Sequence, residues 1–543
     1  MVERIEADVL VAGSGVGGLM AAYRAQRAGA RVVLLGGSGG ASQRISSLNT
    51  ALGYDACDTP AGLFDDMFRA GGYVNVPEVV AALTHRIGRE TEHLADLGVP
   101  FIRAGDRLAR RQAAGSSWTR AIFTEGMVGA DIARVLAAEI ARCDEPAVVQ
   151  VKGALLVELR TGDGRVVGAL AYSPRDRRWL EVRAPSVVLA TGGAGQLFGS
   201  TTNPRGSRGI GYSAALEAGA ELMDLEFISF EPFVTSAPEG LRGQDLPTTV
   251  LREGAKLRNG NGEEFLDTAS APTKDIICRA MVREVLEGRG TPSGSIYFDL
   301  REMEPANATR YVGIAEALRT RDIASREALL EVMPAQHFMM GGIRIDARGR
   351  STLPGLYAVG EVAGGAHGGH RLAAGGGLEV VAGGAITGES AALDAVDNPL
   401  RLSAAQAEPR PDLLGLSLPD DAMSSLGRIA EALDNACGIL RDRAELTAAV
   451  ALLSEERDRS SEQLRNPFVL RSATLALAVA QSALTRSESR GDHFRLDSPH
   501  RDDTHWLANL VVKSGADAVP EVHREQAGVT CRRAAEPSPA LAV

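Results

Sequence analysis

Two short apolar runs near the start of the chain enclose a segment of small residues, and this pattern predicts the first structural unit. The runs cover residues 9–11 and 32–35, and the segment between them is rich in alanine. Short apolar runs bounded by glycine are typical of buried strands, and an alanine-rich segment of this length favours a helix. We therefore predict a strand–helix–strand unit over residues 9–35.

Apolar periodicity predicts the elements of the rest of the chain. Residues 60–70 and 77–97 read as two helices separated at Gly71-Gly72, because residues such as Val79, Leu83 and Ile87 recur at helical spacing. Residues 227–334 are more charged and less regular, which suggests an inserted domain. Further helices are predicted over residues 129–142, 375–395 and 422–484, and strands over residues 166–172, 182–191 and 356–359.

Three glycines follow the first predicted strand with the spacing GxGxxG. Gly13 allows a sharp turn, Gly15 allows the backbone to approach a pyrophosphate, and Gly18 allows the helix to pack on the sheet. The N–H groups at the start of the helix then face the phosphates. This placement predicts a dinucleotide site. The second strand ends in Gly36-Gly37 rather than in an acid, which counts against an ordinary NAD site.

Composition limits the remaining choices. A chain of 543 residues with 45% hydrophobic and 23% charged residues is expected to form two or three globular domains. The net charge of −11 disfavours nucleic acid and an anionic membrane as partners. No apolar stretch approaches the roughly 20 residues of a membrane span, and no apolar leader precedes residue 9, so we expect a cytoplasmic protein. The five cysteines form no CxxC pair, so we expect no metal centre.

Several motifs resemble those of the flavoprotein subunit of succinate dehydrogenase and fumarate reductase, and of the soluble L-aspartate oxidase branch of that family. The motifs are AGSGVGGLMAA, VVLATGGAG, TNP, HFMMGG, GLYAVGEV, HGGHRL and RSESRGDHFRLDSPHRDD, in family order. The resemblance implies an α/β fold with a split, Rossmann-like FAD-binding domain, an inserted α+β capping domain and a C-terminal helical domain. The implied boundaries are 1–226 and 337–403 for the FAD-binding domain, 227–336 for the capping domain, 404–421 for a linker, 422–530 for the helical domain and 531–543 for a tail.

The resemblance also implies where FAD binds. The first glycines would hold the pyrophosphate, Ala154 would meet adenine through its backbone, Glu361 would bind ribityl hydroxyls, and Gly376-Gly377 would lie against the flavin ring. Gly40 stands where membrane-bound members carry the histidine that links FAD covalently, so we expect non-covalent FAD. The full set of expected cofactor residues is Gly13, Ser14, Gly15, Gly17, Gly18, Ser38, Gly39, Gly40, Ser42, Ser46, Ser47, Ala154, Thr191, Gly192, Asn203, Glu361, Gly376 and Gly377.

Of the residues expected to carry out the chemistry, some match those of the family and others differ from them. The family holds a four-carbon dicarboxylate beside the flavin, and His337 and Arg371 match two of its substrate residues. The family's FxQFHPT is here FISFEPF, so Glu231 replaces a histidine and Phe233 a threonine. Lys274 stands where the family has the proton-donating arginine. The expected catalytic set is therefore Lys274, His337, Arg371 and Glu231.

The changed residues predict altered specificity. Glu231 would repel a second substrate carboxylate, so it predicts either a cationic group on the substrate or an internal Glu231–Lys274 pair. Ala113 occupies the position of a glutamate that binds the amino group in L-aspartate oxidase, which argues against plain aspartate oxidation. Lys274 can still exchange protons, because a cationic pocket lowers a lysine pKa.

These observations lead to one expected function and three alternatives. We expect a soluble FAD oxidoreductase that oxidises a small carboxylate or amino acid and passes electrons to O2 or a soluble acceptor. The alternatives are a monooxygenase that N-oxygenates an amino acid, a reductase of an unsaturated carboxylate, and a flavin-binding protein without catalysis.

Overall fold

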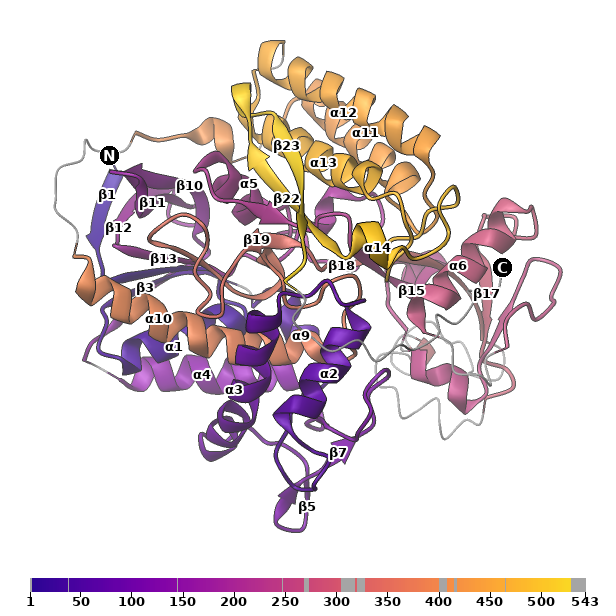
Figure 1. The fold of residues 1–543 in the computed structure, drawn as a ribbon, viewed down its shortest axis with the longest axis horizontal. Coiled ribbons are helices and arrows are strands. Elements are labelled where there is room, and N and C mark those ends of the chain that lie inside the picture. Colours follow the sequence, from indigo (N-terminus) through magenta and orange to yellow (C-terminus); the bar gives the residue numbers. More distant parts are fainter. Residues whose placement is uncertain are drawn as a thin grey trace.

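The computed structural model places a parallel sheet at the centre of the N-terminal part of the chain (Figure 1). Its strand order is β20-β13-β2-β3-β9, with bounds Leu356–Ala358, Ser186–Leu189, Val9–Ala12, Val32–Gly36 and Val148–Lys152. The strands on either side of β2 pair with it in parallel, which confirms the predicted strand–helix–strand unit. The structure describes residues 2–37, 39–143, 145–246, 248–267, 273–303, 318–319, 328–399, 408–414, 418–463 and 465–528.

Helices cover one face of this sheet and a second sheet covers the other (Figure 1). The helices are α1 (Val16–Arg27), α4 (Val128–Arg142) and α10 (Gly384–Asp397). The second sheet has the order β1-β12-β11-β10, with bounds Val2–Glu6, Arg178–Arg183, Arg165–Ser173 and Leu155–Gly162. All residues of β2 and four of the five in β3 are buried, as expected for strands enclosed between two layers.

Small residues allow α1 and α10 to pack closely. A Cβ on Gly384 would lie 2.7 Å from the main-chain oxygen of Gly17, and one on Gly388 would overlap that of Ala21. The predicted helix over residues 375–395 forms in three parts: α9 (Gly375–Leu378), a π-helical turn (Glu379–Gly383) and α10. Its glycine content therefore has a packing reason, and its first turn lies next to the site described below.

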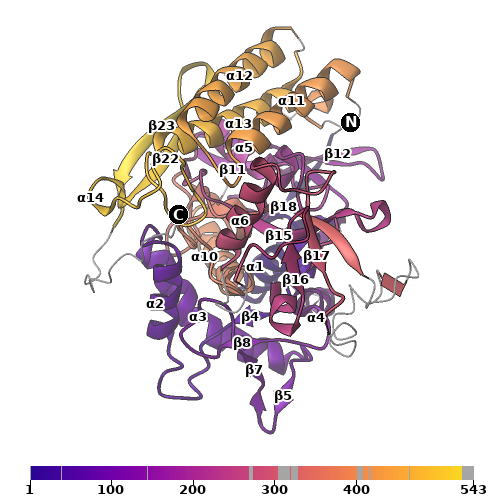
Figure 2. The ribbon, with the colours of Figure 1, turned by 90° about the vertical axis from the view of Figure 1, so that its right-hand side faces the viewer.

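The capping region contains a four-stranded sheet, the helix α6 (Lys274–Leu286) and a core of its own (Figure 2). The strand order is β15-β18-β17-β16, with bounds Ile228–Ala237, Leu329–Met339, Ile296–Asp299 and Lys256–Arg258, and α6 packs on the sheet. β18 continues through residue 337, so the boundary expected between residues 336 and 337 falls inside a strand. The division into domains stays a prediction.

The C-terminal segment begins with α11 (Asp420–Ala436), α12 (Arg443–Glu462) and α13 (Pro467–Thr485). By length and composition α13 could cross a membrane, contrary to the expectation that no stretch approaches such a span. However, 72% of its apolar window is buried inside the protein, against α11, α12 and α5 (Ile210–Glu217) among others. Packing in the protein core therefore accounts for its apolar composition.

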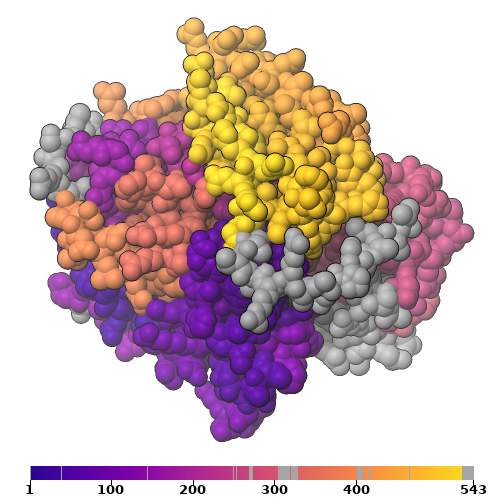
Figure 3. All heavy atoms as spheres, in the orientation of Figure 1, coloured from indigo at the N-terminus to yellow at the C-terminus, as the bar shows by residue number. Residues whose placement is uncertain are grey.

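A hairpin that the sequence analysis did not predict follows these helices. It consists of β22 (Ala508–Ser514) and β23 (Pro520–Gln526), after a one-turn helix, α14 (Asp503–Trp506). β22 pairs with β14 (Leu222–Met223), and Asn509 Nδ2 donates to the main-chain oxygen of Val74 at 2.7 Å. The C-terminal segment (yellow) thus lies directly against the first part of the chain (Figure 3).

Candidate active site

The start of α1 forms a cradle with the geometry that a pyrophosphate requires. Gly15 is the N-cap, and no side chain caps the helix or places an acid in its first turn, all of whose residues the structure describes. Gly13 has φ 121°, and a Cβ there would overlap the main-chain oxygen of Ala190; a Cβ on Gly18 would overlap that of Gly13. The N–H groups at this helix start are therefore left for an anionic ligand.

The loop after β3 closes over this cradle. It includes a 3₁₀ helix, Gly40–Arg44, and a Cβ on Gly15 would lie 2.9 Å from Ser42 Oγ. Gly39 and Gly40 both have positive φ, and Gly40 faces open space. Ser14 adjoins Gly36, where a Cβ would lie 2.7 Å from Ser14 N. Ser38 lies outside the described residues.

The other expected cofactor residues lie on segments around the same cradle. Ala154 is buried in the turn between β9 and β10, and the preceding residue packs against Gly37 at the end of β3. Thr191 Oγ1 is buried without a hydrogen-bond partner among the described residues, and Gly192 has φ 74° and faces open space. Thr191 Oγ1 packs against Gly211 of α5, where a Cβ would overlap it, so the open space beside this segment lies at Gly192.

Of the remaining cofactor candidates, Gly376 and Gly377 lie beside Arg371 and Ser47, and two others do not face the cradle. A Cβ on Gly377 would lie 2.9 Å from the main-chain oxygen of Ser47, and one on Gly376 would lie 3.3 Å from a guanidinium nitrogen of Arg371. Gly17 packs on Val359 instead of facing the cradle, and the side chain of Ser46 is exposed.

Glu361 is a buried carboxylic acid between the cofactor and substrate residues. It accepts a hydrogen bond from Met339 N at 3.0 Å. Burial raises its pKa to about 7, while this hydrogen bond and the charge of Arg371 oppose the rise. The carboxyl group is therefore near half-protonated at neutral pH, so it can accept or donate a hydrogen bond.

His337 lies near the end of β18 and is held by two neighbours. Its Nδ1 lies 2.8 Å from Thr202 Oγ1, and Asn203 Nδ2 donates to its main-chain oxygen at 2.7 Å. Burial and then the charges of Lys274 and Arg371 place its pKa well below the usual range, so the ring is neutral at pH 7. Asn203, expected at the cofactor, supports His337 in this structure.

Arg371 is a half-buried cation that no carboxylate of the described residues binds directly. Its guanidinium lies over the ring of Phe338, 4.5 Å from the centroid, and its Nε has no hydrogen-bond partner among those residues. Burial lowers its pKa, which nearby acids such as Glu361 and Glu231 partly restore. An arginine nevertheless stays charged at any physiological pH. Such a cation can bind a substrate carboxylate by two parallel hydrogen bonds.

Glu231 and Lys274 form an ion pair, the second of the two arrangements that the sequence left open. Lys274 is the first residue of α6, and its Nζ pairs with Glu231 Oε2. The Glu231 side chain is 7% exposed and the Lys274 side chain 39%. Glu231 Oε2 also lies 3.9 Å from His337 Nε2. The carboxylate that replaces the family's histidine is thus neutralised within the protein.

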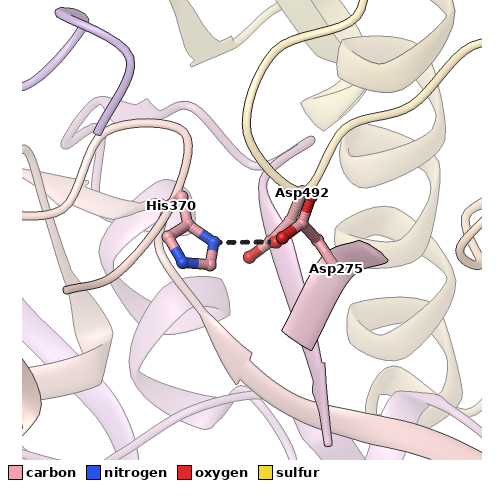
Figure 4. A group of neighbouring side chains, drawn as sticks. All are labelled: Asp275, His370 and Asp492. Carbon is pink, nitrogen blue, oxygen red and sulfur yellow. Dashed lines mark hydrogen bonds and ion pairs between the residues drawn. The ribbon is translucent and has the colours of Figure 1, made fainter. Parts of the chain in front are cut away.

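Sequence reasoning missed four residues near this set: Thr202, Phe338, His370 and Asp492. His370 Nδ1 lies 2.9 Å from Asp492 Oδ1, and Asp275 completes a group whose possible ligand atoms lie within 4.8 Å of one another (Figure 4). These four residues belong to motifs that carry the family resemblance, whereas Asp275 does not. The sequence therefore contained a signal for the four. Their importance depends on contacts between distant segments, which the sequence does not show.

The fold and the site together define a class of protein. A glycine cradle at the first helix of a parallel α/β sheet, faced by a capping sheet that brings histidine, lysine and carboxylate side chains, is the arrangement of a two-part dinucleotide-dependent oxidoreductase.

Comparisons with known proteins identify the family. The family model described as FAD binding domain matches residues 8–377, and the one described as Fumarate reductase flavoprotein C-term matches residues 469–538. L-aspartate oxidase of Streptomyces coelicolor is 34% identical, covering 96% of this chain and 93% of its own. One chain of the fumarate reductase (CoM/CoB) of Methanothermobacter marburgensis is 30% identical, covering 92% of this chain and 95% of its own. A solved structure, Mycobacterium smegmatis Sdh1 in complex with UQ1, superposes with a TM-score of 0.86 at 27% identity, over 98% of this chain and 96% of that chain.

The chain belongs to the succinate dehydrogenase and fumarate reductase flavoprotein family, and it is an FAD-dependent oxidoreductase. The predicted family, fold class and cofactor are confirmed. The roles of the individual site residues stay predictions.

Proposed function

We propose that this enzyme oxidises a small carboxylate or amino acid, bound between the FAD-binding and capping parts with one carboxylate on Arg371. Bound FAD supplies the hydride acceptor. Arg371 carries the proposal, because it is charged, its Nε is buried without a hydrogen-bond partner, and no carboxylate of the described residues binds it directly. A substrate carboxylate would satisfy both its charge and its unpartnered Nε.

The neighbouring side chains have complementary tasks. Neutral His337 donates one hydrogen bond from Nε2 to the same carboxylate, while Thr202 fixes the ring through Nδ1. Lys274, after passing a proton to Glu231, accepts the proton that leaves the carbon next to the one that loses hydride, and Glu231 keeps the lysine close to the pocket. Holding both reacting groups in one geometry is the main contribution of such a site.

FAD in this enzyme is proposed to be non-covalent. Gly40 has no side chain with which to form a link, and the glycine cradle provides the phosphate contacts. Reoxidation by O2 or a soluble acceptor, and a cytoplasmic location, accord with the similarity to L-aspartate oxidases. The same residues would also serve the reverse reaction, reduction of an unsaturated carboxylate; similarity to one chain of a fumarate reductase supports this second candidate.

The test is anaerobic mixing of the purified yellow protein with four- and five-carbon acids and amino acids, followed by the flavin absorption. At least one compound should bleach the flavin, and admission of O2 should restore the colour with stoichiometric peroxide if O2 is the acceptor. A panel without any bleaching would contradict substrate oxidation. A product that carries an atom from ¹⁸O-labelled O2 would instead establish a monooxygenase.

A further inference from the structure

His370 lies where three segments of the chain meet. It is the residue before Arg371 in the loop that leads to α9, and Figure 4 shows its ring facing Asp492 from the loop before α14 and Asp275 from the start of α6. The main chain fixes this arrangement, because Asp492 N donates to the oxygen of Gly369 at 2.9 Å. The side chain of His370 therefore has a defined position next to the proposed carboxylate-binding arginine.

The Asp492 carboxylate fixes the proton on one ring nitrogen of His370. Asp492 is 9% exposed, and Oδ1 lies 2.9 Å from His370 Nδ1, so an ionised carboxylate requires Nδ1 to be the donor. The other oxygen, Oδ2, is buried without a hydrogen-bond partner among the described residues. The second ring nitrogen, Nε2, lies on the side of the ring away from both carboxylates (Figure 4).

His370 is charged at neutral pH. Burial lowers its pKa, but the charge and hydrogen bond of Asp492 and the charge of Asp275 outweigh burial and the opposing charge of Arg371, and the pKa rises to about 9. Nε2 therefore also carries a proton, and it has no hydrogen-bond partner among the described residues. The side chain is 27% exposed, so this N–H is within reach of a ligand.

A protonated His370 accounts for the arrangement of Asp275, His370 and Asp492 better than a bound metal ion does. Both oxygens of Asp275 have partners, Thr273 Oγ1 and, at 2.8 Å, an Arg279 guanidinium nitrogen. Arg371 and Arg441 lie close enough to Asp492 for its charge to affect their pKa values. A divalent ion would have to displace the proton of His370 in the presence of these cations.

We propose that His370 is a second anchor for the substrate, with Nε2–H donating to an anionic oxygen of the substrate beside the carboxylate held by Arg371. Asp492 is the positioning residue that keeps this donor in place. The inference rests on the proposed function and narrows its substrate to an acid with two anionic groups, such as a four-carbon dicarboxylate. A donor at His370 explains how such a substrate is held although Glu231 and Phe233 replace the family's histidine and threonine.

The first test measures binding of succinate and propionate to the holoenzyme by perturbation of the flavin spectrum at pH 7. Propionate is a matched probe, because it lacks one carboxylate of succinate. His370→Gln should weaken the binding of succinate at least tenfold and leave the binding of propionate nearly unchanged. Arg371→Met should weaken the binding of both acids. FAD content and thermal midpoint serve as the check on folding, and His370→Asn is a second variant if His370→Gln folds poorly.

Each outcome separates the two proposals. If the wild type binds neither acid and no compound of the panel bleaches the flavin, the proposed function is overturned and the second anchor with it. If a compound of the panel bleaches the flavin but the wild type does not bind succinate, only the second anchor is overturned. If His370→Gln binds succinate as tightly as the wild type, or loses both acids equally, only the second anchor is overturned.

A second test needs no ligand. Histidine NMR of the holoenzyme, with His370→Gln for assignment, should show His370 titrating near pH 9. Asp492→Asn should lower this pKa by at least about 2 units, since it removes the hydrogen-bonded charge. A wild-type value of about 6.5 or below, or no change in Asp492→Asn, would overturn the proposal.

Discussion

Replacing Lys274 by methionine should raise the pKa of His337. In the wild type Lys274 neutralises Glu231, whose Oε2 lies 3.9 Å from His337 Nε2. The variant leaves an unpaired carboxylate at that distance and removes a cation that lowers the pKa of His337. Both changes favour the imidazolium form, so the pKa of His337 should rise.

The distance sets the size of this effect. Two unit charges 3.9 Å apart interact by about 4 kcal/mol at an effective dielectric constant of about 20. That energy corresponds to a pKa change of about 3 units. Because the His337 side chain is 28% exposed, solvent reduces the interaction, and we expect a rise of about 1–2 units.

The assay is histidine NMR of the holoenzyme across pH, with His337→Gln used for assignment. The double variant Lys274→Met/Glu231→Gln is the matched control, because it removes the unpaired carboxylate as well. Its His337 pKa should fall back towards the wild-type value. A pKa of His337 that stays constant or falls in Lys274→Met would refute the assigned ion pair and its coupling to His337.

Three further predictions concern the anion site, the cradle and pH. Arg371→Met should cost about 2–5 kcal/mol of substrate binding while FAD stays bound; turnover at wild-type substrate concentrations would contradict the anchor. Gly18→Ala should yield protein without FAD, because its Cβ would overlap the oxygen of Gly13, whereas Gly427→Ala, which meets open space, should keep FAD; equal FAD contents would contradict the cradle. Burial raises the pKa of Asp434 to about 6, so the contribution of Asp434 to wild-type stability falls as pH rises from about 3.8 to about 6, and Asp434→Asn should raise the thermal midpoint relative to wild type more at pH 8 than at pH 4. An equal rise in the thermal midpoint at pH 4 and pH 8 would contradict the raised pKa of Asp434.

The first part of the fold could be predicted because its signals are local. Continuous apolar runs mark β2 and β3, and the glycine spacing marks the turn between β2 and α1. The Glu231–Lys274 pair could be anticipated as well, because an acid and a base stand where the family has a histidine and an arginine. In the first case the deciding residues stand close together in sequence, and in the second each stands at a position that the family resemblance identifies.

The hairpin and the His370 group could not be predicted because they depend on contacts between distant segments. β22 pairs with β14, which lies nearly 300 residues earlier in the chain. His370 and Asp492 are separated by 122 positions, and neither is unusual in its own segment. Only the packed structure shows that Asp492 Oδ1 lies within hydrogen-bond distance of the histidine before Arg371.

The central claim is that Arg371 holds a substrate carboxylate next to bound FAD. A crystal structure of the holoenzyme with succinate tests it most directly. We expect one carboxylate in bidentate contact with the Arg371 guanidinium, on the side of the pocket that faces the flavin ring. Succinate bound elsewhere, or a guanidinium that points away from the ring, would contradict it.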